Sequence, residues 1–330
     1  MVFQDFAELT RREDQNQGLK LQSTVALSSL ASPKLLKLSK NVGIAAKLRD
    51  VGLQSVSEHE ALESPARYAI TSLSPGGVRN EQLNISVCQQ VYSAISHNLS
   101  PSTSKAPFQL ILGGECCMLP AILSAFWQHA GSQSPSKRVG LIYIDADTDL
   151  TSPINSSSTG AFAGMNMTHL IQTPGALQSM KQFSQPSGEP VCNASNMVLF
   201  GTNMSFSGNK PEHFAYLFDN NYKVVSSASV SREPEQRAKE ALEYLNDNVD
   251  IIMVHLDVDA IDPQMFPLAN VPNFTGVKFE EMMRALKVFL ASEKAGGLTI
   301  AEVNPDHDPG LEMVERLTEE VVGMLAARNV

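Results

Sequence analysis

The chain has 330 residues, of which 43% are hydrophobic and 18% are charged, and its formal net charge is −10. These values are typical of a globular protein with a sizeable core, and the absence of a basic run argues against a nucleic-acid partner. No apolar stretch approaches the ~20 residues that a membrane helix needs, and the N-terminus lacks a signal pattern. We therefore expect a cytoplasmic protein with no membrane partner.

Along the chain, predicted strands and helices alternate. Residues 1–20 are polar and predict an N-terminal arm, followed by one domain over residues 21–330. Apolar runs predict strands near 23–30, 68–72, 108–112, 140–144, 197–202, 251–254 and 297–303. Amphipathic patterns predict helices near 36–51, 82–98, 117–130, 231–247, 278–292 and 310–328.

The strand segments are continuous apolar runs, which is typical of parallel strands covered on both faces. We therefore predict the α/β fold class: a single three-layer α/β/α domain with a mostly parallel central sheet. In such folds, ligands bind at the carboxyl ends of the strands.

The stretch GLIYIDADTDL, residues 140–150, places Asp145, Asp147 and Asp149 directly after an apolar run. Side chains at alternating positions of an extended segment point to the same side. A polar loop with one aspartate capping the next helix would also explain this stretch. Carboxylates that converge repel one another, so a true cluster indicates a bound cation.

A second stretch, VDIIMVHLDVDAIDP, residues 249–263, repeats the pattern with His255, Asp257 and Asp259. Hard divalent cations prefer oxygen ligands, and two-metal centres need bridging carboxylates. Two buried strands that each end in alternating carboxylates favour metal binding over a polar loop.

Four motifs together resemble the ureohydrolases, the family of arginase, agmatinase and formiminoglutamase. They are ILGGECC, IDADTDL, HLDVDAIDP and IAEVNP, and the resemblance runs from about residue 105 to the end of the chain. It implies two divalent cations, Mn²⁺ in the first place, and a bridging hydroxide that attacks a guanidinium or related carbon.

The resemblance also implies roles for single residues. Asp145 and Asp257 match the bridging carboxylates. Cys116 and Asp149 would complete the ligands of one metal, and Asp147 and Asp259 those of the other. Glu302 matches the glutamate that binds the guanidinium of the substrate, and Asp149 would orient the hydroxide and accept its proton.

Several positions depart from the family pattern. Cys116 and Asp147 each stand where a histidine is usual, and Ala163 stands where arginases have a histidine for proton transfer. Since a thiolate favours softer ions, Zn²⁺ and Fe²⁺ stay open beside Mn²⁺. We expect His255 to lie outside the metal ligands and to hydrogen-bond one of them, with direct ligation left open.

The residues expected to contact the substrate also differ from those of arginases, because Thr151 stands where arginases have an asparagine. The resemblance therefore implies a hydrolase of C–N bonds in a guanidino, ureido or amidino compound other than plain arginine, such as a modified arginine of specialised metabolism. A non-catalytic binding or regulatory protein, or a metal-dependent lyase or cyclase, is the alternative. We expect a small-molecule substrate, with Thr151 and Glu302 contacting it, and a homo-oligomer.

Overall fold

The computed structural model describes residues 22–27, 55–59, 73–74, 76–99, 108–155 and 158–328, together with positions 46, 47 and 50. The predicted arm 1–20 and the predicted strand 68–72 lie outside these residues, as does most of the predicted helix 36–51. The placement of a domain boundary near residue 21 therefore stays a prediction.

Within the described residues, eight strands form a central parallel sheet in the order β2-β1-β3-β8-β7-β4-β5-β6. The strands are β1 (Gln22–Leu27), β2 (Ser55–His59), β3 (Phe108–Leu112), β4 (Val139–Ile144), β5 (Met197–Thr202), β6 (Lys223–Ser226), β7 (Ile251–Asp257) and β8 (Ala295–Ala301). Every residue of β4 and β5 is buried. Their apolar sequences therefore face helices on both sides, as a parallel sheet requires.

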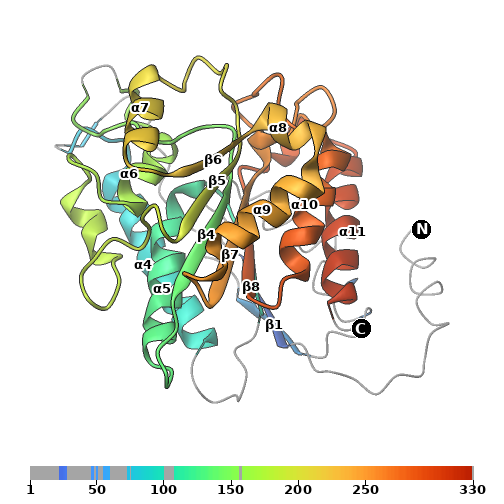
Figure 1. Ribbon diagram of the computed structural model, residues 1–330, viewed down its shortest axis with the longest axis horizontal. Helices are drawn as coiled ribbons and strands as arrows, with labels where there is room; N and C mark the ends of the chain where they lie inside the picture. The colour runs from blue at the N-terminus through green and yellow to red at the C-terminus, as the bar shows by residue number, and fades with distance from the viewer. Residues whose placement is uncertain are drawn as a thin grey trace.

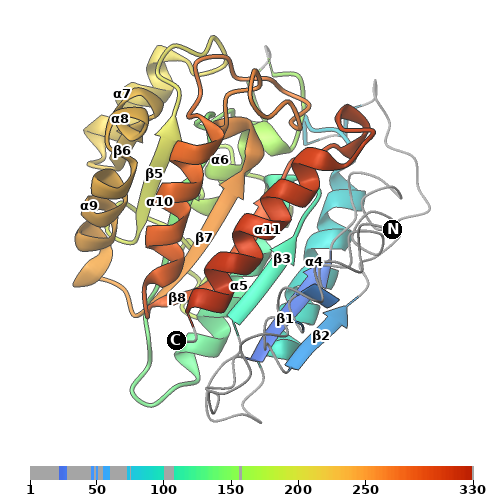
Figure 2. The same ribbon diagram turned by 90° about the vertical axis from the view of Figure 1, so that its right-hand side faces the viewer.

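Helices cover both faces of this sheet (Figure 1). One face packs against α4 (Glu81–Asn98), α5 (Leu119–Gly131), α6 (Asn166–Leu170) and α7 (Pro211–Asp219). The other face packs against α8 (Ser227–Arg232), α9 (Pro234–Asn246), α10 (Phe279–Ala291) and α11 (Glu312–Ala327), and Figure 2 shows α10 and α11 in front of the sheet, running roughly along the strands. The predicted three-layer α/β/α architecture is confirmed.

The described residues also form short 3₁₀ turns: η2 (Cys116–Met118), η3 (Ala163–Met165), η4 (Gln178–Gln182), η5 (Val258–Ala260) and η6 (Pro305–His307). Two of them carry candidate ligands, Cys116 in η2 and Asp259 in η5. Among the described residues, no helix is long and apolar enough to cross a bilayer.

Four of the described elements were not predicted from the sequence: β2, β6, α6 and α7. The strand β6 has only four residues, and the nine-residue α7 buries only Leu217 fully, so neither has a strong apolar pattern. The predicted helix 231–247 is divided, because α8 ends at Arg232 and α9 begins at Pro234. Proline favours the first turn of a helix and disfavours its interior.

The strand order brings distant motifs together. The four strands that carry them are neighbours in the order β3-β8-β7-β4, with β7 and β8 inserted between β3 and β4. Tyr143 on β4 is the register partner of His255 on β7, and Asp257 on β7 is the partner of Ala301 on β8. The carboxyl ends of these strands therefore meet at one edge, where parallel α/β sheets bind ligands.

Candidate metal centre

Acidic side chains and one thiol gather at this edge in three overlapping groups, in each of which the ligand atoms lie within 4.8 Å of one another. The groups are Asp145–Asp147–Asp259, Asp145–His255–Asp257 and Cys116–Asp257–Glu302. Asp145 links the first two groups and Asp257 links the last two. The structure thus brings six of the predicted site residues, together with His255, into one continuous cluster.

Backbone amides orient the carboxylates of this cluster. Oδ1 of Asp145 accepts a 2.6 Å hydrogen bond from the N–H of Asp147, and Oδ1 of Asp257 accepts one of 2.9 Å from Asp259. Oδ1 of Asp259 accepts from the N–H of Ala146 at 3.2 Å, which ties the end of β7 to the end of β4. The turns after the two strands therefore hold the carboxylates in place.

Two carboxylate oxygens in the cluster have no hydrogen-bond partner among the described residues. They are Oδ2 of Asp145 and Oδ1 of Asp147, and both atoms are buried. Leaving a buried polar atom unpaired costs about 1–3 kcal/mol. Two such oxygens in one acidic cluster are the feature expected of ligands to a cation.

The backbone conformation that brings Asp149 to the cluster differs from the extended one that its spacing predicted. The strand ends at Ile144, and Asp149 has a left-handed backbone with φ 47°. Its Oδ2 accepts a 2.5 Å hydrogen bond from the hydroxyl of Tyr143, and the Cys116 thiol lies 3.8 Å from the same oxygen. Asp149 therefore lies beside Cys116, but the extended conformation expected to align the three aspartates ends before it; ligation of one metal by both residues stays a prediction.

Cys116 and Glu302 are connected through the backbone as well. The N–H of Cys116 donates to Oε1 of Glu302 at 3.2 Å, and the N–H of Glu302 donates to the carbonyl of Gly114 at 2.8 Å. Glu302 also has a left-handed backbone, with φ 62°. Left-handed non-glycine residues cost energy and gather at functional sites, and here the turn aims the half-buried Glu302 side chain at the cluster.

His255 is fully buried and stacks against Tyr143, with ring centroids 5.2 Å apart and an interplanar angle of 12°. Burial lowers the pKa of His255 to about 3, so the ring is neutral. Neither ring nitrogen has a hydrogen-bond partner among the described residues. The expected hydrogen bond from His255 to a ligand carboxylate is therefore not among its contacts.

Thr151 lies in the loop after β4, beside the turn that contains Ala163. Its N–H donates to the carbonyl of Gly164 at 3.1 Å, and its carbonyl accepts from Thr168 at 3.0 Å. The Cys116 thiol lies 3.7 Å from the carbonyl of Ala163. Thr151 is thus anchored to the loop next to the cluster, and contact with a substrate stays a prediction.

The cluster carries a large electrostatic cost when no cation is bound. Burial is the main cause that raises the pKa of Asp147 to about 9, of Asp149 to about 7 and of Asp259 to about 6. Burial, followed by the charges of neighbouring aspartates, also holds the pKa values of Asp145 and Asp257 well above their usual range. In the described part of the chain, no ion pair joins a lysine or arginine to any of these carboxylates.

The donor set suits divalent cations. Carboxylate oxygens are ligands for Mn²⁺, and the Cys116 thiolate suits Zn²⁺ or Fe²⁺. The unpaired oxygens of Asp145 and Asp147, and the lack of a counter-charge, fit a centre that becomes stable when cations bind.

Comparisons with known proteins agree with this geometry. The family model described as "Arginase family" matches residues 43–327. The chain belongs to the arginase family.

Among relatives in this family, an arginase of Staphylococcus aureus is 28% identical over 236 residues, which is 70% of this chain and 71% of that protein. A formimidoylglutamase of Rhodococcus opacus is 29% identical over 181 residues, 54% of this chain and 49% of that protein. The solved arginase of Bacillus caldovelox superposes with a TM-score of 0.77 at 18% identity, covering 93% of this chain and 98% of that one. The predicted ureohydrolase membership is confirmed, and these relatives support an amidinohydrolase-like enzyme.

Two contacts of the site were missed from the sequence. Tyr143 donates to Asp149, and Asn273 donates to Oδ2 of Asp259 at 3.2 Å. Tyr143 could have been found, since it lies two residues before Asp145 and so shares its side of the strand. Asn273 lies in the loop after β7, and no local pattern marks it.

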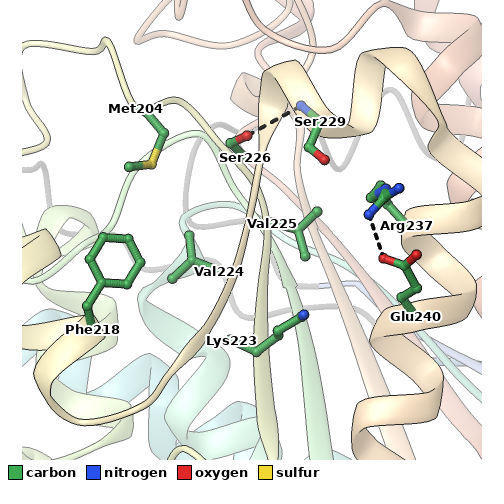
Figure 3. Close-up of a pocket in the computed structure, with 9 residues that line it drawn as sticks. All are labelled: Met204, Phe218, Lys223, Val224, Val225, Ser226, Ser229, Arg237 and Glu240. Atoms are coloured by element: carbon green, nitrogen blue, oxygen red, sulfur yellow. Dashed lines mark hydrogen bonds and ion pairs between the residues drawn. The ribbon is translucent and has the colours of Figure 1, made fainter.

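A separate surface pocket of about 300 Å³ lies along the edge strand β6 and is drawn in Figure 3. Its lining residues are Met204, Phe218, Lys223, Val224, Val225, Ser226, Ser229, Arg237 and Glu240. None of the candidate ligands lines this pocket, so it does not belong to the metal centre.

Proposed function

We propose that this member of the arginase family is a metal-dependent hydrolase of a C–N bond in a guanidino, ureido or amidino compound. One observation carries the proposal. The half-buried carboxylate of Glu302 lies within 4.8 Å of ligand atoms of the buried Cys116 and Asp257, in an acidic cluster of which only Asp147 is likewise half-buried. A group that can bind a cationic substrate head thus lies next to groups that can bind metal.

Six residues would hold two divalent cations: Cys116, Asp145, Asp147, Asp149, Asp257 and Asp259. The cations, Mn²⁺ by family and Zn²⁺ or Fe²⁺ by the chemistry of Cys116, would lower the pKa of a water molecule and so supply a nucleophile at neutral pH. Asp145 and Asp257 are each shared between two of the observed groups, which supports their assignment as the bridging carboxylates.

Glu302 would bind and orient the substrate. A planar guanidinium pairs well with a carboxylate because two N–H donors can meet two oxygens. The backbone N–H of Cys116 already holds Oε1 of Glu302 at 3.2 Å, which fixes the direction of the carboxylate. A bound cationic head would also offset the negative charge at this side of the cluster.

Asp149 would accept the proton of the attacking water. In the metal-free protein, burial raises the pKa of this carboxyl to about 7, and the hydrogen bond from Tyr143 favours its charged form. Bound cations would favour the charged form further, and only the charged carboxylate can accept a proton. Ala163 cannot replace the histidine that arginases use for proton transfer, so this role falls on Asp149.

The substrate we propose is not plain arginine. Ala163 and Thr151 replace two groups that arginases use, and a substrate with a better leaving group needs less help with proton transfer. A modified arginine of specialised metabolism fits these changes. We also retain the prediction of a homo-oligomer, which sedimentation would test.

The test is a screen of guanidino, ureido and amidino compounds for release of urea, ammonia or amine, with protein loaded with Mn²⁺ or Zn²⁺. We expect turnover of at least one class. Glu302→Gln should abolish turnover yet keep the bound metal. Glu293→Gln, at an exposed position, should leave both turnover and metal content unchanged. Metal binding with no product from any class would favour the non-catalytic alternative, and a dehydrated or cyclised product would favour a lyase or cyclase.

A further inference from the structure

The predicted role of His255, a hydrogen bond to a ligand carboxylate, does not explain its position in the acidic cluster. It lies two residues before Asp257 on β7, and Tyr143, its register partner, lies two residues before Asp145. Residues two apart on a strand point to the same face. The two stacked rings therefore form a floor beneath the carboxylates of Asp145 and Asp257.

The polar atoms around this floor lack partners. Both ring nitrogens of His255 and Oδ2 of Asp145 are buried without a hydrogen bond among the described residues. The imidazole nevertheless offers a nitrogen within 4.8 Å of oxygens of Asp145 and Asp257. Groups that are this close, yet make no hydrogen bond, leave a space that a cation with bonds of about 2.0–2.2 Å would fill.

We propose that His255 is a direct metal ligand, and that its imidazole binds one cation of the centre together with the carboxylates of Asp145 and Asp257. This inference rests on the metal centre of the proposed function. It adds to that centre a ligand absent from the family motifs, at the position where the motif that HLDVDAIDP resembles has a serine.

The charge of the centre supports this assignment. Cys116 and the five aspartates would bring six negative charges against the four positive charges of two divalent cations. Any further ligand should therefore be neutral. Because Cys116 and Asp147 replace both histidines of the family pattern, His255 would restore one imidazole, a ligand that suits Zn²⁺ and Fe²⁺.

Thr299 is a candidate partner for the second nitrogen of the ring, although no hydrogen bond joins the two residues in the structure. It is the register partner of His255 on β8, and its hydroxyl is also buried without a hydrogen bond. Register partners in a parallel sheet point to the same face. Once one nitrogen binds the cation, the other N–H would donate to Thr299, in the way that ligating histidines use their free nitrogen.

The experiment is pulsed electron paramagnetic resonance on the full chain loaded with Mn²⁺, which detects the ¹⁴N nuclei of a bound imidazole. The matched control is His169, which is also buried and stacks on Phe162 with centroids 5.1 Å apart, but belongs to none of the three groups. We expect imidazole signals in the wild type and in His169→Gln, and none in His255→Gln. The affinity for metal should fall at least about tenfold in His255→Gln.

Labelling the wild-type protein with ¹⁵N-histidine tests the same point without a substitution, should His255→Gln fail to fold. The signal should then change from ¹⁴N to ¹⁵N. Bound Mn²⁺ without any histidine signal, or a signal that persists in folded His255→Gln, would overturn this inference and leave the proposed hydrolase intact. A wild-type protein that binds no divalent cation would overturn both.

Discussion

The hydroxyl of Tyr143 donates a 2.5 Å hydrogen bond to Oδ2 of Asp149, the oxygen that also lies 3.8 Å from the Cys116 thiol. Asn166 in turn donates to the Tyr143 oxygen at 3.1 Å. Two buried hydrogen bonds in series thus end on the carboxylate that we propose as the base. They connect this base to Tyr143, whose ring stacks on His255.

Tyr143→Phe should raise the pKa of Asp149. The hydrogen bond favours the charged carboxylate, so its loss favours the protonated form. Since only the unprotonated form can accept a proton, the acid limb of kcat/KM should move to higher pH. Loss of a buried hydrogen bond should also cost about 1–3 kcal/mol of unfolding free energy. Phenylalanine keeps the ring that stacks on His255.

Tyr244→Phe is the control for this change, because the hydroxyl of Tyr244 donates to the carbonyl of Ala194 at 2.8 Å and has no contact with the cluster. It should lower stability without moving the pH profile. An acid limb that stays in place in Tyr143→Phe would contradict the role of Asp149 as the base.

The metal-free protein should lose stability as the pH rises. The folded pKa values of Asp259, Asp149 and Asp147 are about 6, 7 and 9, each above the usual aspartate value of 3.8. The folded state therefore holds protons that the unfolded state releases. Their stabilising contribution is complete below pH 3.8 and is lost as the pH passes through 6, 7 and 9.

Urea denaturation of protein treated with a chelator, at pH 5, 7 and 9, would measure this loss. Added Mn²⁺ or Zn²⁺ should restore more stability at pH 9 than at pH 5, because the cation replaces the missing protons. A metal-free protein that grows more stable over this range would contradict the charge balance that we describe.

Asp145→Asn should weaken metal binding and stabilise the metal-free protein. The amide oxygen can still accept the N–H of Asp147, which is 2.6 Å from Oδ1 in the wild type. The variant also lacks an acid whose pKa is raised by burial and neighbouring carboxylates, so the cost of ionising it in the metal-free cluster as the pH rises disappears. Thermal unfolding with and without metal would show both effects. Asp262→Asn is the control, since Asp262 accepts an N–H in the turn after β7 and belongs to no metal-binding group; it should keep the metal response.

Cys116→Ser should remove the thiolate absorption band of protein loaded with Co²⁺, if Cys116 binds metal as proposed. The adjacent and equally buried Cys117 is a close control, because it belongs to none of the three groups. Cys117→Ser should keep the band. The preference for Zn²⁺ over Mn²⁺ should fall in Cys116→Ser, since a hydroxyl is a harder ligand than a thiolate. An unchanged band in Cys116→Ser would remove this residue from the ligand set.

Much of this centre follows from local pattern in the sequence. The apolar runs before Asp145 and Asp257 predicted β4 and β7, and the alternation after them placed Asp145 beside Asp147 and Asp257 beside Asp259. The sheet then pairs these two strands directly. Site residues at the ends of these strands could be predicted from the sequence, because the carboxyl ends of parallel strands lie at the same edge of the sheet.

Other features depend on strand order and loop conformation, which local pattern does not carry. The insertion of β7 and β8 between β3 and β4 brings Cys116 to Glu302, two residues 186 positions apart. The left-handed backbone of Asp149 and Glu302 is imposed by tertiary contacts, and it decides where both carboxylates point. The stacking of His255 on Tyr143 likewise follows from register.

The central claim is that the cluster binds two divalent cations, and elemental analysis tests it most directly. Protein purified without added metal, and again after dialysis against Mn²⁺ or Zn²⁺, should hold about two ions per chain. Asp257→Ala, which removes a carboxylate shared by two of the groups, should hold fewer while remaining folded. No bound metal under any of these conditions, or full occupancy in a folded Asp257→Ala, would contradict the account.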